Sequence, residues 1–284
     1  MAGSGLIGIK RRIKSITNTK KITKAMGLVA TAKLRKTREA LEVNKLYDTF
    51  LDSILSKILD NQSLENIYKS GNGSKKKLYI VLTSDTGLCG SFNLNVLNKA
   101  LEEVSKDKEN SLLMVLGEKG VSHFRRLNYN LSKTYIDIPD LPTLGDANHY
   151  AMDALHMYSE NEIGEINVVY AEFHAQTNQE IVVKRLLPLM EDVIEKSKDD
   201  NIIFEPEINK ILDNIIPLYM RQSMLNSLLH SKTSEQSIRM TAMDGATKNA
   251  NQLLDRLNLK YNRMRQGAIT QEISEIVGGA EAQK

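Results

Sequence analysis

Apolar and small residues recur at intervals of three, four and seven from Gly8 to Leu59, and no proline interrupts them. Such spacing places them on one narrow stripe of an α-helix, which at about 1.5 Å per residue would be about 75 Å long. A second helical pattern begins near Glu207 and continues almost to the end of the chain. Pro217 falls inside it, and we expect a bend there rather than a stop.

Between these two patterns, short apolar runs alternate with helical spacing. The pattern predicts strands at 78–83, 112–116, 166–174 and 180–187, a weakly alternating segment at 131–138, and helices at 93–104, 118–127 and 146–158. Asn93 is expected to cap the first of these helices. Alternating strands and helices with an antiparallel finish favour a small three-layer α/β domain.

The predicted fold is therefore an α/β domain inserted between two long helices that form an antiparallel coiled coil. Its predicted parts are an N-terminal helix at 1–60, a linker at 61–77, a small Rossmann-like domain at 78–196 and a C-terminal helix at 205–284. We expect each long helix to cover its apolar stripe only against the other. The segment Ser231–Gln236 is polar on every face and stands out within the second helix.

The charge of the chain is unevenly distributed. Residues 1–38 hold eleven Lys or Arg and no acid, although the whole chain has a net charge of only +3. Such a basic helix suits an acidic protein partner, an anionic membrane surface or nucleic acid, or is simply solvated. The single cysteine, Cys89, excludes an intrachain disulfide, and no apolar run is long enough for a membrane span.

The chemistry-bearing residues give weak signals. The glycine-rich segment 83–91 follows a predicted strand, where backbone N–H groups could hold a phosphate, but it lacks the Gly-Lys-Ser/Thr of a P-loop. A tight structural turn is the favoured interpretation, and a buried structural role is favoured for Cys89. The five histidines are scattered without metal-ligand spacing. We therefore expect no catalytic residue, no cofactor and no metal in this chain.

Four segments resemble one known family. The segment 269–280, ITQEISEIVGGA, is similar to the C-terminal signature of F-type ATP synthase gamma subunits. The segments 15–26, 84–93 and 239–243, which read SITNTKKITKAM, SDTGLCGSFN and RMTAM, resemble the same family in the same order. Two departures are Gly267, where the family more often has Ala or Ser, and Ile238, which is bulkier than usual.

The resemblance implies a non-catalytic rotor subunit that transmits torque between a proton-driven c ring and a catalytic ring of alpha and beta subunits. Its implied partners are the alpha and beta subunits, the epsilon subunit and the c-subunit ring, with no nucleic acid and no membrane insertion. It implies a peripheral place on the cytoplasmic face of a bacterial cell membrane. The residues that it assigns to partner contacts are Lys24, Met26, Arg239, Arg265, Gln266, Thr270, Glu272, Glu275, Phe204 and Glu205.

Two alternatives remain at this level. One is a basic coiled-coil adaptor for nucleic acid, and the other is a small α/β enzyme with helical arms. Both leave the ordered series of four motifs unexplained.

Overall fold

The computed structural model describes residues 2–59, 66–189 and 207–281. In chain order its elements are α1 (Ala2–Leu59), α2 (Ile67–Ser70), β1 (Lys77–Leu82), α3 (Phe92–Lys106), β2 (Ser111–Leu116), α4 (Glu118–Arg126), β3 (Leu131–Tyr135), α5 (Leu144–Ser159), β4 (Glu165–Ala175), β5 (Asn178–Leu187) and α6 (Ile208–Glu281). They form two compact units, Met1–Ala30 with Met240–Lys284, and Thr31–Arg239. Helix α6 continues through Pro217, as the sequence predicted.

The first unit consists of the two ends of the chain, paired as helices. The hydroxyls of Thr23 and Thr247 lie 2.8 Å apart, and a Cβ added at Gly27 would lie 3.5 Å from Cβ of Met243. Along the pair, the residue numbers on α6 decrease as those on α1 increase, so the two helices are antiparallel. This confirms the predicted coiled coil. Small residues make this close approach possible, because a larger side chain at Gly27 would meet the facing helix.

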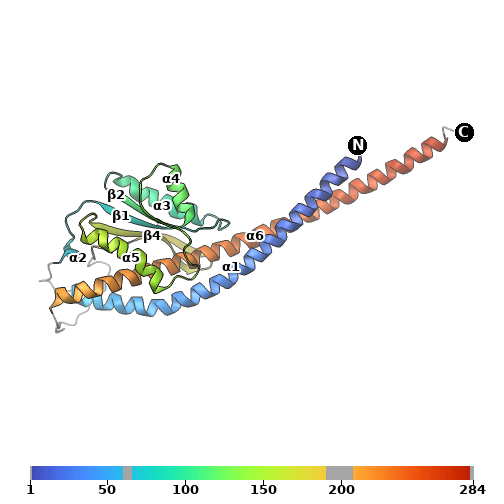
Figure 1. Cartoon of the computed structure of the whole chain (residues 1–284). Helices are drawn as coiled ribbons and strands as arrows, with labels where there is room; N and C mark the ends of the chain where they lie inside the picture. The colour runs from blue at the N-terminus through green and yellow to red at the C-terminus, as the bar shows by residue number, and fades with distance from the viewer. Residues whose placement is uncertain (1, 60–65, 190–206, 282–284) are drawn as a thin grey trace. The chain divides into compact units, whose positions relative to one another are not determined.

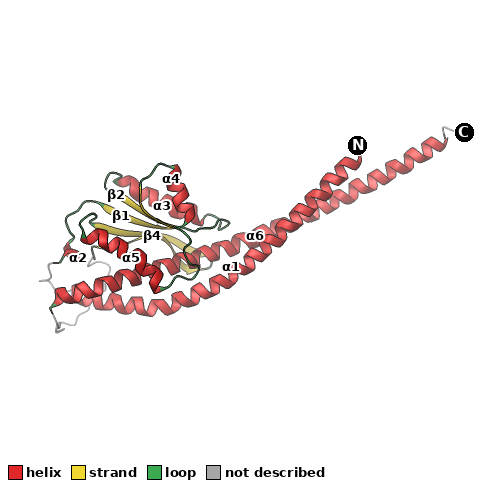
Figure 2. Ribbon diagram, in the orientation of Figure 1, coloured by secondary structure: helices red, strands yellow, loops and turns green. Residues whose placement is uncertain are grey.

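The second unit contains a five-stranded sheet in the order β3-β2-β1-β4-β5. The first four strands are parallel, and β5 pairs antiparallel with β4. Strand β1 lies at the centre, with Lys77 opposite Ser111 of β2 on one side and Glu165 of β4 on the other. This arrangement confirms the predicted α/β domain with an antiparallel finish (Figure 2).

Helices cover both faces of this sheet (Figure 1). Alternate residues of β1 face opposite ways, so Val81 packs with α3 and α4 while Ile80 packs with α5. The core on the α5 side also includes Leu55 of α1 and Met220 of α6. The long helices therefore contribute to the core of the α/β domain, and the expectation that each would be covered only by the other is wrong.

The polar middle of α6 follows from this packing. All six residues of Ser231–Gln236 are buried, at 5 % exposure or less. Ser234 Oγ donates to the carbonyl of Ala171 at 3.1 Å, and Ser237 Oγ donates to that of Gln176 at 3.2 Å. Ser234 thus satisfies its buried hydroxyl on a carbonyl of β4, and Ser237, one residue beyond the segment, does the same on the residue that follows β4.

Two local expectations are corrected. The range 61–77, expected to be a linker, includes the helix α2, which is capped by Asn66 and held by a 2.7 Å bond from the Tyr158 hydroxyl to the carbonyl of Ile67. Asn93 is not the N-cap of α3, since the helix begins at Phe92. Its side chain instead accepts the N–H of Ser84 at 3.0 Å.

Candidate partner-binding surfaces and the buried network of helix α6

The residues expected at the C-terminal tip lie on α6 with their side chains in solvent. Arg265, Gln266, Thr270, Glu272 and Glu275 are all exposed. None of these side chains has a role in the core of the unit.

The same tip also carries apolar side chains that the sequence reasoning did not assign. Ile269, Ile273 and Ile276 are 45, 56 and 67 % exposed. Their spacing of four and three places them on one face of the helix. This spacing was the signal in the sequence, and in a two-helix unit such a face needs a partner.

A second exposed apolar surface lies on α1. Lys24 is exposed and Met26 is half-buried, and they precede Leu28 and Val29, which are 65 and 53 % exposed. Within the same unit, Ala30 faces inward and is fully buried. The basic helix therefore combines cations with uncovered apolar groups, as expected for a protein-binding helix.

Arg239 is placed differently from the other expected contact residues. It is only 6 % exposed, and its guanidinium donates to Glu235 at 2.7 Å and to the carbonyls of Thr86 and Gly87 at 3.1 and 3.3 Å. Arg239 thus binds the glycine-rich loop within this chain. Its expected contact with a beta subunit stays a prediction.

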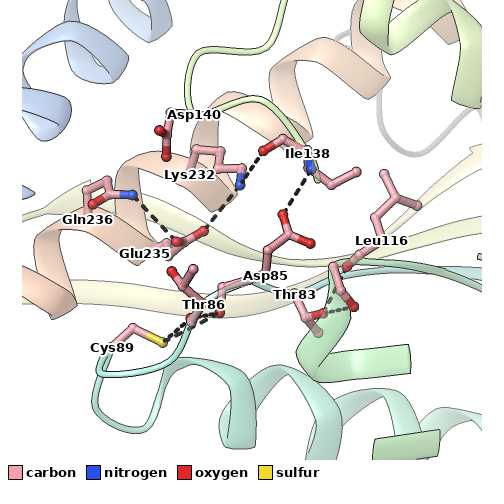
Figure 3. Close-up of polar contacts among 12 residues, drawn as sticks. Thr83, Asp85, Thr86, Cys89, Leu116, Ile138, Asp140, Lys232, Glu235 and Gln236 are labelled. Atoms are coloured by element: carbon pink, nitrogen blue, oxygen red, sulfur yellow. Dashed lines mark hydrogen bonds and ion pairs between the residues drawn. The ribbon is translucent and has the colours of Figure 1, made fainter. Parts of the chain in front are cut away.

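Glu235 connects Arg239 to a wider buried network, of which Figure 3 shows the part around Glu235 and Lys232. Lys232 lies 3.6 Å from Glu235 and donates to the carbonyl of Ile138 at 3.2 Å. Lysine, glutamate and arginine are spaced three and four residues apart, so all three lie on one face of α6. This spacing could have identified the network in the sequence, where the segment read only as polar on all faces.

Asp85 of the glycine-rich loop accepts backbone N–H groups from outside that loop. Its carboxylate accepts the N–H of Glu118, the first residue of α4, at 3.0 Å. It also accepts the N–H groups of Asp137 and Ile138 at 3.1 and 2.9 Å (Figure 3). An anion at the amino end of α4 is therefore supplied by the chain itself, which supports a structural turn.

Cys89 and the histidines show no catalytic arrangement among the described residues. Cys89 is 2 % exposed, and the amide of Asn93 donates to its sulfur at 3.2 Å. His230 accepts the N–H of Phe173 at 3.1 Å, and burial lowers its pKa to about 4. A histidine held neutral on a backbone donor acts here as a packing group.

Residues 2–59, 66–189 and 207–281 offer neither a metal site nor a membrane span. There, no group of three or more His, Cys, Asp or Glu is placed to hold a metal ion. None of the described helices is both long and apolar enough to cross a membrane. Phe204 and Glu205 lie outside the described residues, so their expected contacts stay predictions.

An α/β domain inserted between two long terminal helices, with apolar and charged side chains left uncovered where those helices pair, defines a subunit of a larger assembly. Comparison with known proteins identifies which one. A family model described as ATP synthase matches residues 5–283. The chain is 55 % identical to the ATP synthase gamma chain of Clostridium pasteurianum over 281 residues, 99 % of each protein. It is also 55 % identical to that of Clostridium kluyveri over 284 residues, all of both proteins.

Solved structures show the same fold. The chain matches the central stalk and c-ring structure of Tetrahymena thermophila mitochondrial ATP synthase with a TM-score of 0.65 and 28 % identity, covering 79 % of this chain and 99 % of that one. It matches the rotor of the Euglena gracilis enzyme with a TM-score of 0.70 and 17 % identity, covering 94 % and 99 %, a likeness of fold. The chain belongs to the ATP synthase gamma-chain family.

Proposed function

We propose that this chain is the central-stalk rotor of an F-type ATP synthase, which transmits torque between a proton-driven c ring and a catalytic ring of alpha and beta subunits. Family membership supports the assignment. The single observation that carries the mechanical role is the paired-helix unit, which leaves Leu28 and Ile276 about two-thirds exposed, at 65 and 67 %. Side chains of this kind on a two-helix unit are suited to sliding contact inside a surrounding ring.

The mechanism depends on asymmetry. Three like catalytic subunits are equivalent until one shaft contacts each of them differently, and a partner shifts a conformational equilibrium only through such differential contact. Turning the shaft then takes each catalytic site through its affinity states in sequence. In this proposal the nucleotide sites belong to the partner subunits, and this chain is not itself a catalyst.

The proposed contacts follow the exposed residues. Lys24 and Met26 would meet acidic segments of beta subunits, in agreement with the acid-free basic helix. The tip residues Arg265, Gln266, Thr270, Glu272 and Glu275 would meet a loop of beta. Arg239 would reach a partner only by releasing Glu235 or the carbonyl of Thr86.

The other end of the rotor would contact the epsilon subunit and the c ring. Phe204 and Glu205 are proposed for this contact. With these partners the chain would be peripheral to a bacterial cell membrane, on its cytoplasmic face.

Removing the tip tests the proposal. A chain truncated after Arg263 keeps the α/β domain and most of the helix pair but loses every proposed tip contact. We expect the assembled enzyme with this variant to synthesise ATP from a proton gradient at a strongly reduced rate, because less torque reaches the beta subunits. A chain ending at Glu281 serves as the control and should retain the full rate. Undiminished proton-driven synthesis after truncation at Arg263 would rule out the tip contacts.

A further inference from the structure

A cavity of about 430 Å³ lies within the second unit, between α1, α6 and the β4–β5 hairpin. Its wall includes charged and polar side chains from all four elements. They are Asp48 and Asp52 of α1, Tyr170 and Glu172 of β4, Lys184 and Arg185 of β5, and Tyr219 and Asn226 of α6. The cavity belongs neither to the exposed helix tips nor to the Arg239 network.

A chain of side-chain amides leads to Asp48. Gln222 donates to Asn44 at 2.6 Å, Asn44 donates to Asn226 at 3.1 Å, and Asn226 donates to Oδ2 of Asp48 at 2.8 Å. The bonds cross between α6 and α1 three times and all run in one direction. Each amide fixes the next, so Asn226 presents an N–H to Asp48, and Oδ2 is an acceptor whether or not Asp48 carries a proton.

The charges around Asp48 oppose one another. Asp52 follows it by four residues on α1, so the two carboxylates share a helix face and repel when both are ionised. Lys184 faces both carboxylates from β5 and favours their ionised forms. Arg185 is engaged with Glu165 at 3.4 Å, and Glu172 lies 3.8 Å from His174. The cavity is therefore rich in acid, with Lys184 as its main counter-charge.

Two buried tyrosines and a histidine complete the surroundings. Tyr170 and Tyr219 are 4 and 7 % exposed, and burial raises the pKa of each well above its usual range, so both are neutral hydroxyls. His230 of α6 also faces Lys184 and is held neutral. Burial also raises the pKa of Asp52, and it raises that of Asp48 to about 6, ahead of the effects of Lys184 and Asp52, so the charge of Asp48 changes near neutral pH.

We propose that this cavity is a proton-sensitive joint, in which uptake of one proton on Oδ1 of Asp48 strengthens the attachment of α1 to α6 and to the β4–β5 hairpin. The neutral carboxyl keeps its bond from Asn226, no longer repels Asp52 and no longer opposes burial. The ionised carboxylate needs Lys184 or water, and it therefore favours an open, hydrated cavity.

The direction in which stability changes with pH follows from the linkage between proton binding and folding. A carboxyl whose pKa is higher in the folded chain than its ordinary 3.8 stabilises the fold fully below pH 3.8, and this contribution is lost as the pH rises through about 6. A shift of this size corresponds to a proton affinity about a hundredfold higher than that of an ordinary aspartate. The joint is therefore tighter in mildly acidic solution.

The test uses the full-length chain and the Asp48→Asn variant, whose side chain is neutral at every pH. Thermal unfolding is followed from pH 4.5 to 7.5. We expect the midpoint of the variant, relative to that of the unmodified chain, to rise by several degrees across this range. Asp213→Asn, which alters an exposed aspartate of α6, should keep a constant offset. A constant offset for Asp48→Asn as well would overturn the proposal.

Two further measurements remain informative if Asp48→Asn does not fold. In the unmodified chain, the ¹³C carboxyl signal of Asp48 should titrate near pH 6, and in Asp52→Asn it should titrate at lower pH. Amide protection of the α1 segment 44–58, corrected for intrinsic exchange, should rise severalfold on acidification. A carboxyl signal that titrates near pH 4, or protection that does not change with pH, would contradict the joint.

Discussion

Among single residues, the buried ions of α6 show most directly how charge is used inside this chain. Lys232, Glu235 and Arg239 are each 6 % exposed or less, so all three have lost most of their hydration. Their mutual contacts and the carbonyls of the surrounding loops offset that loss. Removing one member leaves the others charged and buried, which costs more than the pair itself contributes.

Replacing Arg239 by alanine should therefore destabilise the fold by about 3 kcal/mol. The variant leaves Glu235 with Lys232 alone and removes the donors to the carbonyls of Thr86 and Gly87. Urea unfolding measured by circular dichroism checks this value. Lys248→Ala is the control, because its pair with Asp244 is exposed to solvent and should contribute little to stability. Equal losses in the two variants would show that burial of the network does not matter.

His230 gives a pH-dependent prediction of the opposite sign to that of Asp48. Its pKa is lowered to about 4 from an ordinary 6.5, so its contribution to stability is present above pH 6.5 and is lost as the pH falls towards 4. The variant His230→Asn keeps an acceptor for the N–H of Phe173 but cannot take up a proton. Between pH 6.5 and 4, the unmodified chain should lose about 2 kcal/mol relative to this variant.

Chemical unfolding at a series of pH values measures the difference in unfolding free energy between the unmodified chain and His230→Asn. The exposed His156 provides the matched control, since His156→Asn should keep a constant offset. Asp48 and His230 act in opposite directions over nearly the same range of pH, so the stabilities of the two single variants, each relative to the unmodified chain, should change with pH in opposite directions.

Among the helices and strands, the sequence predicted what depends on periodicity. The central strands, the helices between them and both long helices follow from regular apolar spacing. The burial of the polar middle of α6 could not be predicted in this way, because the hydroxyls of Ser234 and Ser237 donate to carbonyls that are distant in the sequence. The prediction that Asn93 caps α3 failed for a similar reason, because the side chain of Asn93 accepts the N–H of Ser84, which lies nine residues earlier in the chain.

Replacement by alanine at two glycines, one inside α6 and one just before α4, should change stability in opposite directions. Gly267 lies in α6, and a Cβ there would meet nothing within 4 Å, so Gly267→Ala should stabilise the helix by about 1 kcal/mol. Gly117 has φ +100°, and a Cβ there would lie 2.3 Å from the carbonyl oxygen of Thr83. Gly117→Ala should cost several kcal/mol for that reason. Thermal unfolding of both variants checks the two signs, and two changes of the same sign would contradict this account.

On the scale of the whole molecule, the chain divides differently from the sequence-based interpretation. The boundary between the two units falls within the long helices, near Ala30 and Arg239, rather than where strands begin. A sequence pattern shows that a helix continues, but it does not show where its packing partner changes.

The candidate contact residues could be predicted only through resemblance. Arg265 and Glu272 differ in no local property from other exposed charges on a helix, and only their place in a known motif singles them out. The isoleucine face beside them, by contrast, can be recognised from spacing and exposure. Arg239 shows the limit of the motif, because its internal partners appear only in the folded chain.

The carboxylate of Asp85 joins the loop after β1 to the amino end of α4 and to the segment after β3. Because this carboxylate is part of the chain, the N–H of Glu118 at the amino end of α4 keeps its acceptor at any concentration of dissolved phosphate.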